Sequence, residues 1–196
     1  MALCRILHIL SIGSDYEFAS HALKAGHQVY VMSFEGHKEY LPKLSPEIQK
    51  LTTQVLKTAD PYLKTANKKL ERSLSGNAYV MNLLRRNYFQ IKSVSSVYAV
   101  GDFLDSGKKD SVRVSGGTAW ACQMFIDKMV DEDKEDIHKV GLFFFSQKDG
   151  SWFQCSLTKD QVSWDKIDKP PKPKGKYAGI GTRELTPKGR ETIKAF

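Results

Sequence analysis

The chain has 196 residues, of which 41% are hydrophobic and 11% aromatic, a content typical of one packed domain over residues 1–196 and not of a disordered chain. Its longest apolar runs are far too short to span a bilayer, so we expect no membrane partner. The net charge of +8 suggests nucleic acid binding, but the basic residues are scattered between acidic blocks, which favours an ordinary solvated basic surface. A phosphate-bearing small ligand accounts for the charge as well as DNA does.

The N-terminal segment predicts a strand, a helix and a second strand in succession. An apolar run at 4–10 ends at the turn 11–15, after which residues 16–26 have helical composition and close on a glycine. Residues 27–34 are β-branched and aromatic, as in a strand. Short connections of this kind favour a right-handed crossover between parallel strands.

Residues 35–76 differ from this pattern because they are polar, rich in lysine and interrupted by prolines. We predict one helix over about 46–58 and another over about 60–72. We interpret residues 40–72 as a helical insert in the domain.

The second half of the chain alternates again between helices and strands. A helix is predicted over 78–93 and a strand over 96–103. A helix over 115–130 has apolar residues at helical spacing, and the wholly apolar segment 140–146 predicts a central strand covered on both faces. Residues 150–156 are expected to form a hairpin partner at the sheet edge.

The C-terminal segment completes the pattern after a proline-rich connector at 165–176. A short strand at 176–180 leads through a tight turn to a helix that begins near Thr186 and Pro187. The whole alternation predicts an α/β fold with a doubly wound, mostly parallel, Rossmann-like sheet. In such sheets the ligand binds beyond the carboxyl ends of the strands.

Three glycine-rich turns are predicted at that edge, each after a strand and before a helix. One such turn often serves packing alone, but three together indicate a phosphate-lined cleft, because amides at helix N-termini donate to phosphate oxygens. The residues expected to bind phosphate or nucleotide are Gly13 and Ser14 in the first turn, Gly116, Gly117 and Thr118 in the second, and Gly179, Gly181, Thr182 and Arg183 in the third.

Four motifs together resemble the SLOG superfamily, which includes the DNA-processing protein A domain and the "lonely guy" phosphoribohydrolases. They are KYAGIGTRELTP, SIGSDYEFASHAL, LLRRNYFQI and SGGTAWACQMFI. In that superfamily the G-x-G-[ST]-R motif comes first, whereas here it comes last. The resemblance therefore implies a circular permutation, together with nucleotide binding and a homo-oligomer. We expect no cofactor.

The resemblance also implies roles for single residues. Arg86 and Asn87 match the R-N pair that helps to shape the nucleotide pocket. Gln123 stands near the place of the catalytic glutamate of the phosphoribohydrolases, and an amide cannot act as a general base. A hydrolase would need another carboxylate, for which the candidates are Asp15, Glu17 and Asp102. Each also has a structural interpretation, since an acid in a first helical turn, such as Asp15 or Glu17, stabilises the helix dipole, and Asp102 at the end of its strand can serve to satisfy a loop.

The cysteines and histidines indicate neither a metal site nor a disulfide framework. The three cysteines lie far apart without C-x-x-C spacing, and the five histidines are equally scattered. We therefore expect no bound metal, and we expect the reducing cytoplasm as the location.

Three functions stand as hypotheses. The first is binding of a nucleotide or an ADP-ribose-like signal without chemistry, as a sensor or as a sponge for a defence messenger, a role suspected for some phage proteins of this general kind. The second is cleavage of an N-glycosidic or phosphoribosyl bond in a nucleotide. The third is binding of single-stranded DNA, although the scattered charges favour the first two.

Overall fold

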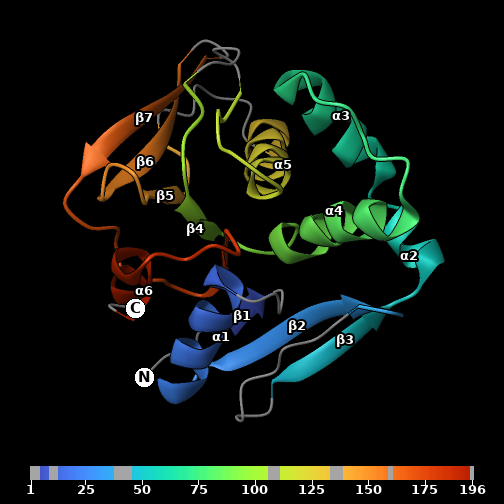
Figure 1. Ribbon diagram of the computed structural model, residues 1–196, viewed down its shortest axis with the longest axis horizontal. Coiled ribbons are helices and arrows are strands. Elements are labelled where there is room, and N and C mark those ends of the chain that lie inside the picture. Colours follow the sequence, from blue (N-terminus) through green and yellow to red (C-terminus); the bar gives the residue numbers. More distant parts are fainter. Residues whose placement is uncertain are drawn as a thin grey trace.

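The computed structural model describes residues 5–8, 13–37, 46–105, 111–132, 139–158 and 161–194, which form one eight-stranded sheet with helices on both faces (Figure 1). The strands are β1 (Arg5–His8), β2 (Gln28–Phe34), β3 (Glu47–Leu51), β4 (Ser96–Gly101), β5 (Leu142–Ser146), β6 (Ser151–Thr158), β7 (Gln161–Ile167) and β8 (Lys176–Gly181). Their order is β3-β2-β1-β8-β4-β5-β6-β7. The first six in this order run parallel, and β6 and β7 form an antiparallel hairpin beside β5. The predicted α/β, mostly parallel architecture is confirmed.

Helices cover the two faces of the sheet unequally. They are α1 (Ser14–Lys24), α2 (Thr53–Lys57), α3 (Asp60–Leu70), α4 (Ala78–Ile91), α5 (Thr118–Glu132) and α6 (Pro187–Lys194). Figure 1 shows α1 and α6 together on one face and the other four helices on the opposite face. None of these helices, which are those of the described ranges, has the length and apolar character needed to cross a membrane.

The core is divided by the sheet into two clusters. Phe18 of α1 and Ile193 of α6 pack in one, and Phe125 of α5 packs in the other. Side chains of β5 alternate between them, because successive residues of a strand point to opposite faces. Phe144 packs on the α5 side and Phe143 on the α1 side. All five residues of β5 are buried, as predicted for a central strand.

The helices α4 and α6, like α2 with Thr52, begin at side-chain caps that the sequence encodes. Asn77 precedes α4, and its side-chain oxygen accepts hydrogen bonds from the amides of Tyr79 at 2.9 Å and Val80 at 3.2 Å. Thr186 precedes α6 and accepts from the amide of Gly189 at 3.1 Å. The predicted start of the last helix is therefore confirmed, with its proline in the first turn.

The predicted helix over 46–58 is wrong. The structure has β3 at 47–51 and only the short helix α2 after it. The open edge of β2 accounts for the difference, because β3 pairs with it in parallel, placing Ile48 beside Val31 and Leu51 beside Phe34. Pairing and half-burial override the helical composition of this segment. The insert predicted at 40–72 is thus not wholly helical, and its residues 40–45 lie outside the described ranges.

The other predicted elements differ mainly in their limits. The hairpin partner predicted at 150–156 is β6, but β7 lies outside it and forms the edge of the sheet. Because β7 extends to Ile167, the segment without regular structure begins at Asp168 and not at 165. The strand predicted at 4–10 is described only over β1.

The last strand occupies the centre of the sheet. β8 lies between β1 and β4, parallel to both. If β8 is counted first, followed by β1, β2, β4 and β5, their spatial order is 3-2-1-4-5, the doubly wound order of dinucleotide-binding folds. The point where this order reverses lies between β8 and β4, and ligands of such sheets bind at the carboxyl ends of the strands at that point.

Candidate functional site

A cavity of about 530 Å³ opens at the carboxyl ends of β8 and β4. Its volume lies in the range of small-molecule sites. Its walls come from the turn after β8, the turn before α5, one face of α4 and the start of α1. The polar residues and glycines that line it are Asp15, Arg86, Asn87, Gln90, Gly101, Ser115, Gly116, Gly117, Thr118, Gly181, Thr182, Arg183 and Glu184.

The turn before α5 presents open backbone to this cavity. Gly116 has a φ of +63°, and a side chain added at Gly116 or Gly117 would meet no atom within 4 Å. Both glycines are exposed. The first N–H groups of a helix have no partner within the helix, so the start of α5 offers donors to an anion. The side chain of Asn87 holds this turn by donating to the carbonyl of Gly117 at 3.3 Å.

Arg72, just beyond α3, fixes the same turn from outside the cavity. Its guanidinium donates to the carbonyls of Gly116 at 2.8 Å and Val114 at 2.7 Å. It also lies over the ring of Trp120 at 4.9 Å, and Trp120 in turn donates to the side chain of Asn67 at 3.3 Å. Trp120 therefore supports the anchor of the turn and is not part of the cavity wall.

The turns at Gly13 and Gly181 pack against each other. Gly13 has a φ of +110°, and a Cβ placed there would lie 2.5 Å from the carbonyl oxygen of Thr182. The amide and hydroxyl of Ser14 both donate to that same carbonyl at 3.0 Å. A Cβ at Gly181 would lie 2.4 Å from the carbonyl oxygen of Val100. These glycines let α1, β8 and β4 approach closely, which positions Thr182 and Arg183 at the cavity.

Arg86 is a buried cation in the cavity wall, with only 3% of its surface exposed. Burial lowers its pKa to about 10, Arg183 also lowers it, and the nearby carboxylate of Asp15 opposes the shift. Its guanidinium donates to Nε2 of His37 at 2.5 Å. Burial, and then Arg86 and Arg183, lower the pKa of His37 to about 4, so this imidazole is neutral and accepts the bond. Sequence reasoning missed His37, because one of five scattered histidines carries no local signal.

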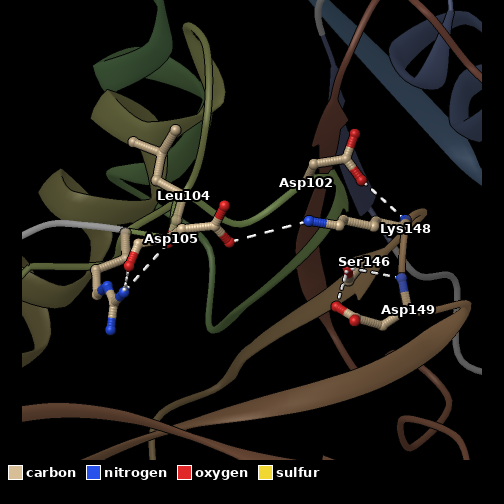
Figure 2. A network of polar contacts seen from close by, with 7 residues as sticks. Asp102, Leu104, Asp105, Ser146, Lys148 and Asp149 are labelled. Atoms are coloured by element: carbon tan, nitrogen blue, oxygen red, sulfur yellow. Dashed lines mark hydrogen bonds and ion pairs between the residues drawn. The ribbon is translucent and has the colours of Figure 1, made fainter.

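The three candidate carboxylates lie in different places. Asp15 is buried and lines the cavity. Glu17 faces α6 instead, where it pairs with Arg190, and it lies 3.5 Å from His21. Asp102 accepts a hydrogen bond from the backbone amide of Lys148 at 2.9 Å and so holds the turn between β5 and β6 (Figure 2). Asp15 is the one of the three in the cavity wall.

The other polar residues around Asp102 belong to this turn and to the loop after β4. Figure 2 shows the hydroxyl of Ser146 donating to the carboxylate of Asp149 at 2.5 Å, while the amino group of Lys148 lies 3.9 Å from the carboxylate of Asp105. These contacts stabilise the surface turn between β5 and β6. None of the side chains that make them lines the cavity.

The structure brings most of the predicted site residues together. Those in the cavity wall are Asp15, Arg86, Asn87, Gly116, Gly117, Thr118, Gly181, Thr182 and Arg183, and those outside it are Gly13, Ser14, Glu17, Asp102 and Gly179. Gly179 lies within β8, paired with Tyr98 of β4. Within the part of the chain that the structure describes, no three His, Cys, Asp or Glu side chains gather as metal ligands would.

The chain matches no protein-family model and no curated protein. Among solved structures it is similar to the DNA/pantothenate metabolism flavoprotein from Streptococcus pneumoniae, at 8% sequence identity and a TM-score of 0.31, over 85% of this chain and 93% of that one. A likeness at this TM-score supports no statement about function.

Proposed function

We propose that this chain binds a nucleotide or a nucleotide-derived small molecule, such as an ADP-ribose-like compound, in the cavity between β8 and β4. It acts as a sensor or as a sequestering module. The observation that carries the proposal is the meeting of two glycine turns and two guanidinium groups, those of Arg86 and Arg183, in one cavity at the reversal of strand order.

In this proposal the phosphate lies at the start of α5. The amides of Gly117 and Thr118 donate to it, and Arg183 completes the anion site from the turn after β8. Burial, and then the charges of Arg86 and Arg183, lower the pKa of His37, so both cations lie near this imidazole. Arg86 is buried, which strengthens its attraction for an anion because the local dielectric is low, whereas Arg183 reaches the cavity as an exposed side chain.

The proposal also makes the chain a SLOG-like domain with its usual first strand and helix supplied from the C-terminus. The motif order supports this assignment, since counting from β8 restores the 3-2-1-4-5 arrangement. The same proposal includes a homo-oligomer in the cytoplasm. Cys122 and Cys155 are buried free thiols, as is usual in a reducing compartment.

A second candidate function is cleavage of an N-glycosidic or phosphoribosyl bond. The observation that favours it is the position of Asp15, a buried carboxylate in the cavity wall near Arg86. Gln123 contributes nothing to such a reaction, because it lies outside the cavity wall with its amide bonded to Val112 and Asp127.

Capture and turnover are distinguished by incubating the protein with nucleotides and ADP-ribose and identifying the small molecules by mass spectrometry. Binding alone returns each ligand unchanged after denaturation. A hydrolase releases free base or ribose phosphate, and the Asp15→Asn variant then binds the ligand without releasing product. If the wild type retains no compound of this panel, the proposed function is wrong.

Arg183→Ala is expected to weaken nucleotide binding by roughly 1.5–3 kcal/mol, the contribution of a charged hydrogen bond. Isothermal titration calorimetry measures the change. Arg190→Ala is the matched control, because Arg190 follows in the same C-terminal segment but pairs with Glu17 outside the cavity. Equal affinities of the wild type and the Arg183→Ala variant would remove Arg183 from the site.

A further inference from the structure

One face of α4 is buried although it is polar. Gln90 lies four residues after Arg86 and three residues after Asn87, so the three side chains lie toward the side of the helix that faces the cavity. Their exposed fractions are 3%, 8% and 0%. A helix in this position normally buries an apolar stripe, so the polar face needs an account beyond folding.

Gln90 is the most unusual of the three. Its side-chain oxygen and nitrogen are both buried, and neither makes a hydrogen bond within the described ranges. A buried amide without such bonds costs free energy, and proteins rarely keep one unless it serves another purpose. Because Gln90 lines the cavity, a bound ligand can supply the missing partners.

Gln123 on α5 shows how a structural glutamine differs. It is equally buried, but its oxygen accepts from the amide of Val112 at 3.1 Å and its nitrogen donates to Asp127 at 3.0 Å. Both of its polar atoms are thus satisfied by the fold. Gln90 has the same side chain in the same degree of burial without this role.

The surroundings of Gln90 indicate the kind of group that it would meet. Leu84, Ala121 and Ile180 also line the cavity, so apolar walls accompany the amide. Arg86, a cation that attracts an anionic group, lies four residues earlier in the helix, about one turn or roughly 5–6 Å away. A ligand that fits has an anion at one end and a flat, uncharged part with an adjacent donor and acceptor at the other.

We propose that Gln90 is a specificity residue that binds the hydrogen-bonding edge of a nucleobase within the cavity. A glutamine amide presents a donor and an acceptor side by side, which is the pairing that reads a base edge. The base faces pack on the apolar walls, and the phosphate lies toward the arginines and the start of α5. This inference rests on the proposed nucleotide binding and adds the recognition of the base to it.

The test compares wild type, Gln90→Met and Gln123→Met by isothermal titration calorimetry with AMP, CMP, GMP, UMP and ribose 5-phosphate. Methionine keeps the volume of glutamine and removes its hydrogen bonds. Gln90→Met is expected to lose about tenfold in affinity for the preferred nucleotide and to bind the four nucleotides alike. Its affinity for ribose 5-phosphate, which has no base, is expected to stay within about twofold of the wild type.

Melting temperatures separate recognition from a structural role. Gln90→Met is expected to melt at the wild-type temperature or above it, whereas Gln123→Met melts lower because it leaves the amide of Val112 unbonded and removes one hydrogen bond from Asp127, which keeps its bond from Lys69. Gln90→Leu repeats the measurement with a second apolar side chain of similar size. If both Gln90 variants melt well below the wild type, Gln90 is structural and the inference is wrong.

The binding data distinguish the two proposals. If the wild type binds none of the five compounds, nucleotide binding itself fails and the inference falls with it. If the wild type binds ribose 5-phosphate as tightly as the nucleotides, or if Gln90→Met keeps the wild-type preferences, the inference about Gln90 is overturned while binding in the cavity stands.

Discussion

At the scale of single residues, Gly13 shows why a glycine at a strand-to-helix turn need not bind a ligand. Its positive φ and the carbonyl oxygen 2.5 Å from an added Cβ both exclude a side chain. Gly13→Ala is therefore expected to lower the free energy of unfolding by about 2–4 kcal/mol, through backbone strain and overpacking. Urea denaturation followed by circular dichroism measures the loss.

Gly117→Ala is the matched control. Gly117 does not have a positive φ, and an added Cβ there has open space. The control is expected to change the free energy of unfolding by less than about 0.5 kcal/mol, as for a surface substitution. Equal losses in the two variants would contradict the view that Gly13 serves packing and Gly117 leaves the cavity open.

At the scale of elements, the end of α3 controls the position of the turn before α5. Arg72→Ala removes both hydrogen bonds to the turn and the contact with Trp120. The expected loss of stability is about 1–2 kcal/mol, the range for bonds from a charged donor that is half exposed. Nucleotide affinity is expected to fall as well, because the amides of the turn are then no longer held in one arrangement.

Arg72→Lys and Lys68→Ala complete this experiment. Lysine keeps the charge but lacks the planar fork that reaches two carbonyls, so Arg72→Lys is expected to recover only part of the loss. Lys68 is exposed in α3, four residues before Arg72, and its replacement is expected to leave stability and binding unchanged. If Arg72→Lys matches the wild type in stability and in nucleotide affinity, the positive charge alone is responsible, and not the anchoring of the turn.

The elements that sequence predicted well are those whose own residues decide them. The buried strand β5, the capped starts of α4 and α6 and the glycine turns follow from local patterns. The strand β3 does not, because its pairing depends on the open edge of β2, which no local composition reports. His37 and Gln90 escaped prediction for the same reason, since their roles arise from a cavity between distant segments.

At the scale of the whole molecule, the position of the cavity could be predicted from the alternation of strands and helices. The rule that ligands bind where strand order reverses placed it at the carboxyl ends of the parallel strands. The exclusion of the turn at Gly13 from its wall could not be predicted, because that depends on how closely α1 approaches β8. The close packing at Gly13 and Gly181 leaves Thr182 and Arg183 at the cavity and keeps Gly13 and Ser14 out of it.

The topology also predicts that the chain can be reordered without changing its fold. A variant that begins at Gly175, continues through α6, and is joined by a short Gly-Ser linker to Met1 has β8, α6 and β1 as its first strand, helix and strand. Its new ends fall in the segment 168–175, which has no regular structure, so no strand or helix is cut. The joined segment contains residues 195–196, the linker and residues 1–4, a length that suits a helix-to-strand connection.

This reordered chain is expected to have the circular dichroism spectrum of the wild type and a cooperative unfolding transition, because every contact of the central strand with β1 and β4 is retained. It is also expected to keep the nucleotide preferences of the wild type. The control is a chain opened inside α4 between Leu84 and Arg85, which cuts a helix that packs against α5 and lines the cavity. If the first variant loses the cooperative unfolding transition as the control does, the central strand depends on its covalent connection to the hairpin β6–β7. The fold then does not form from the reordered chain, and the prediction is wrong.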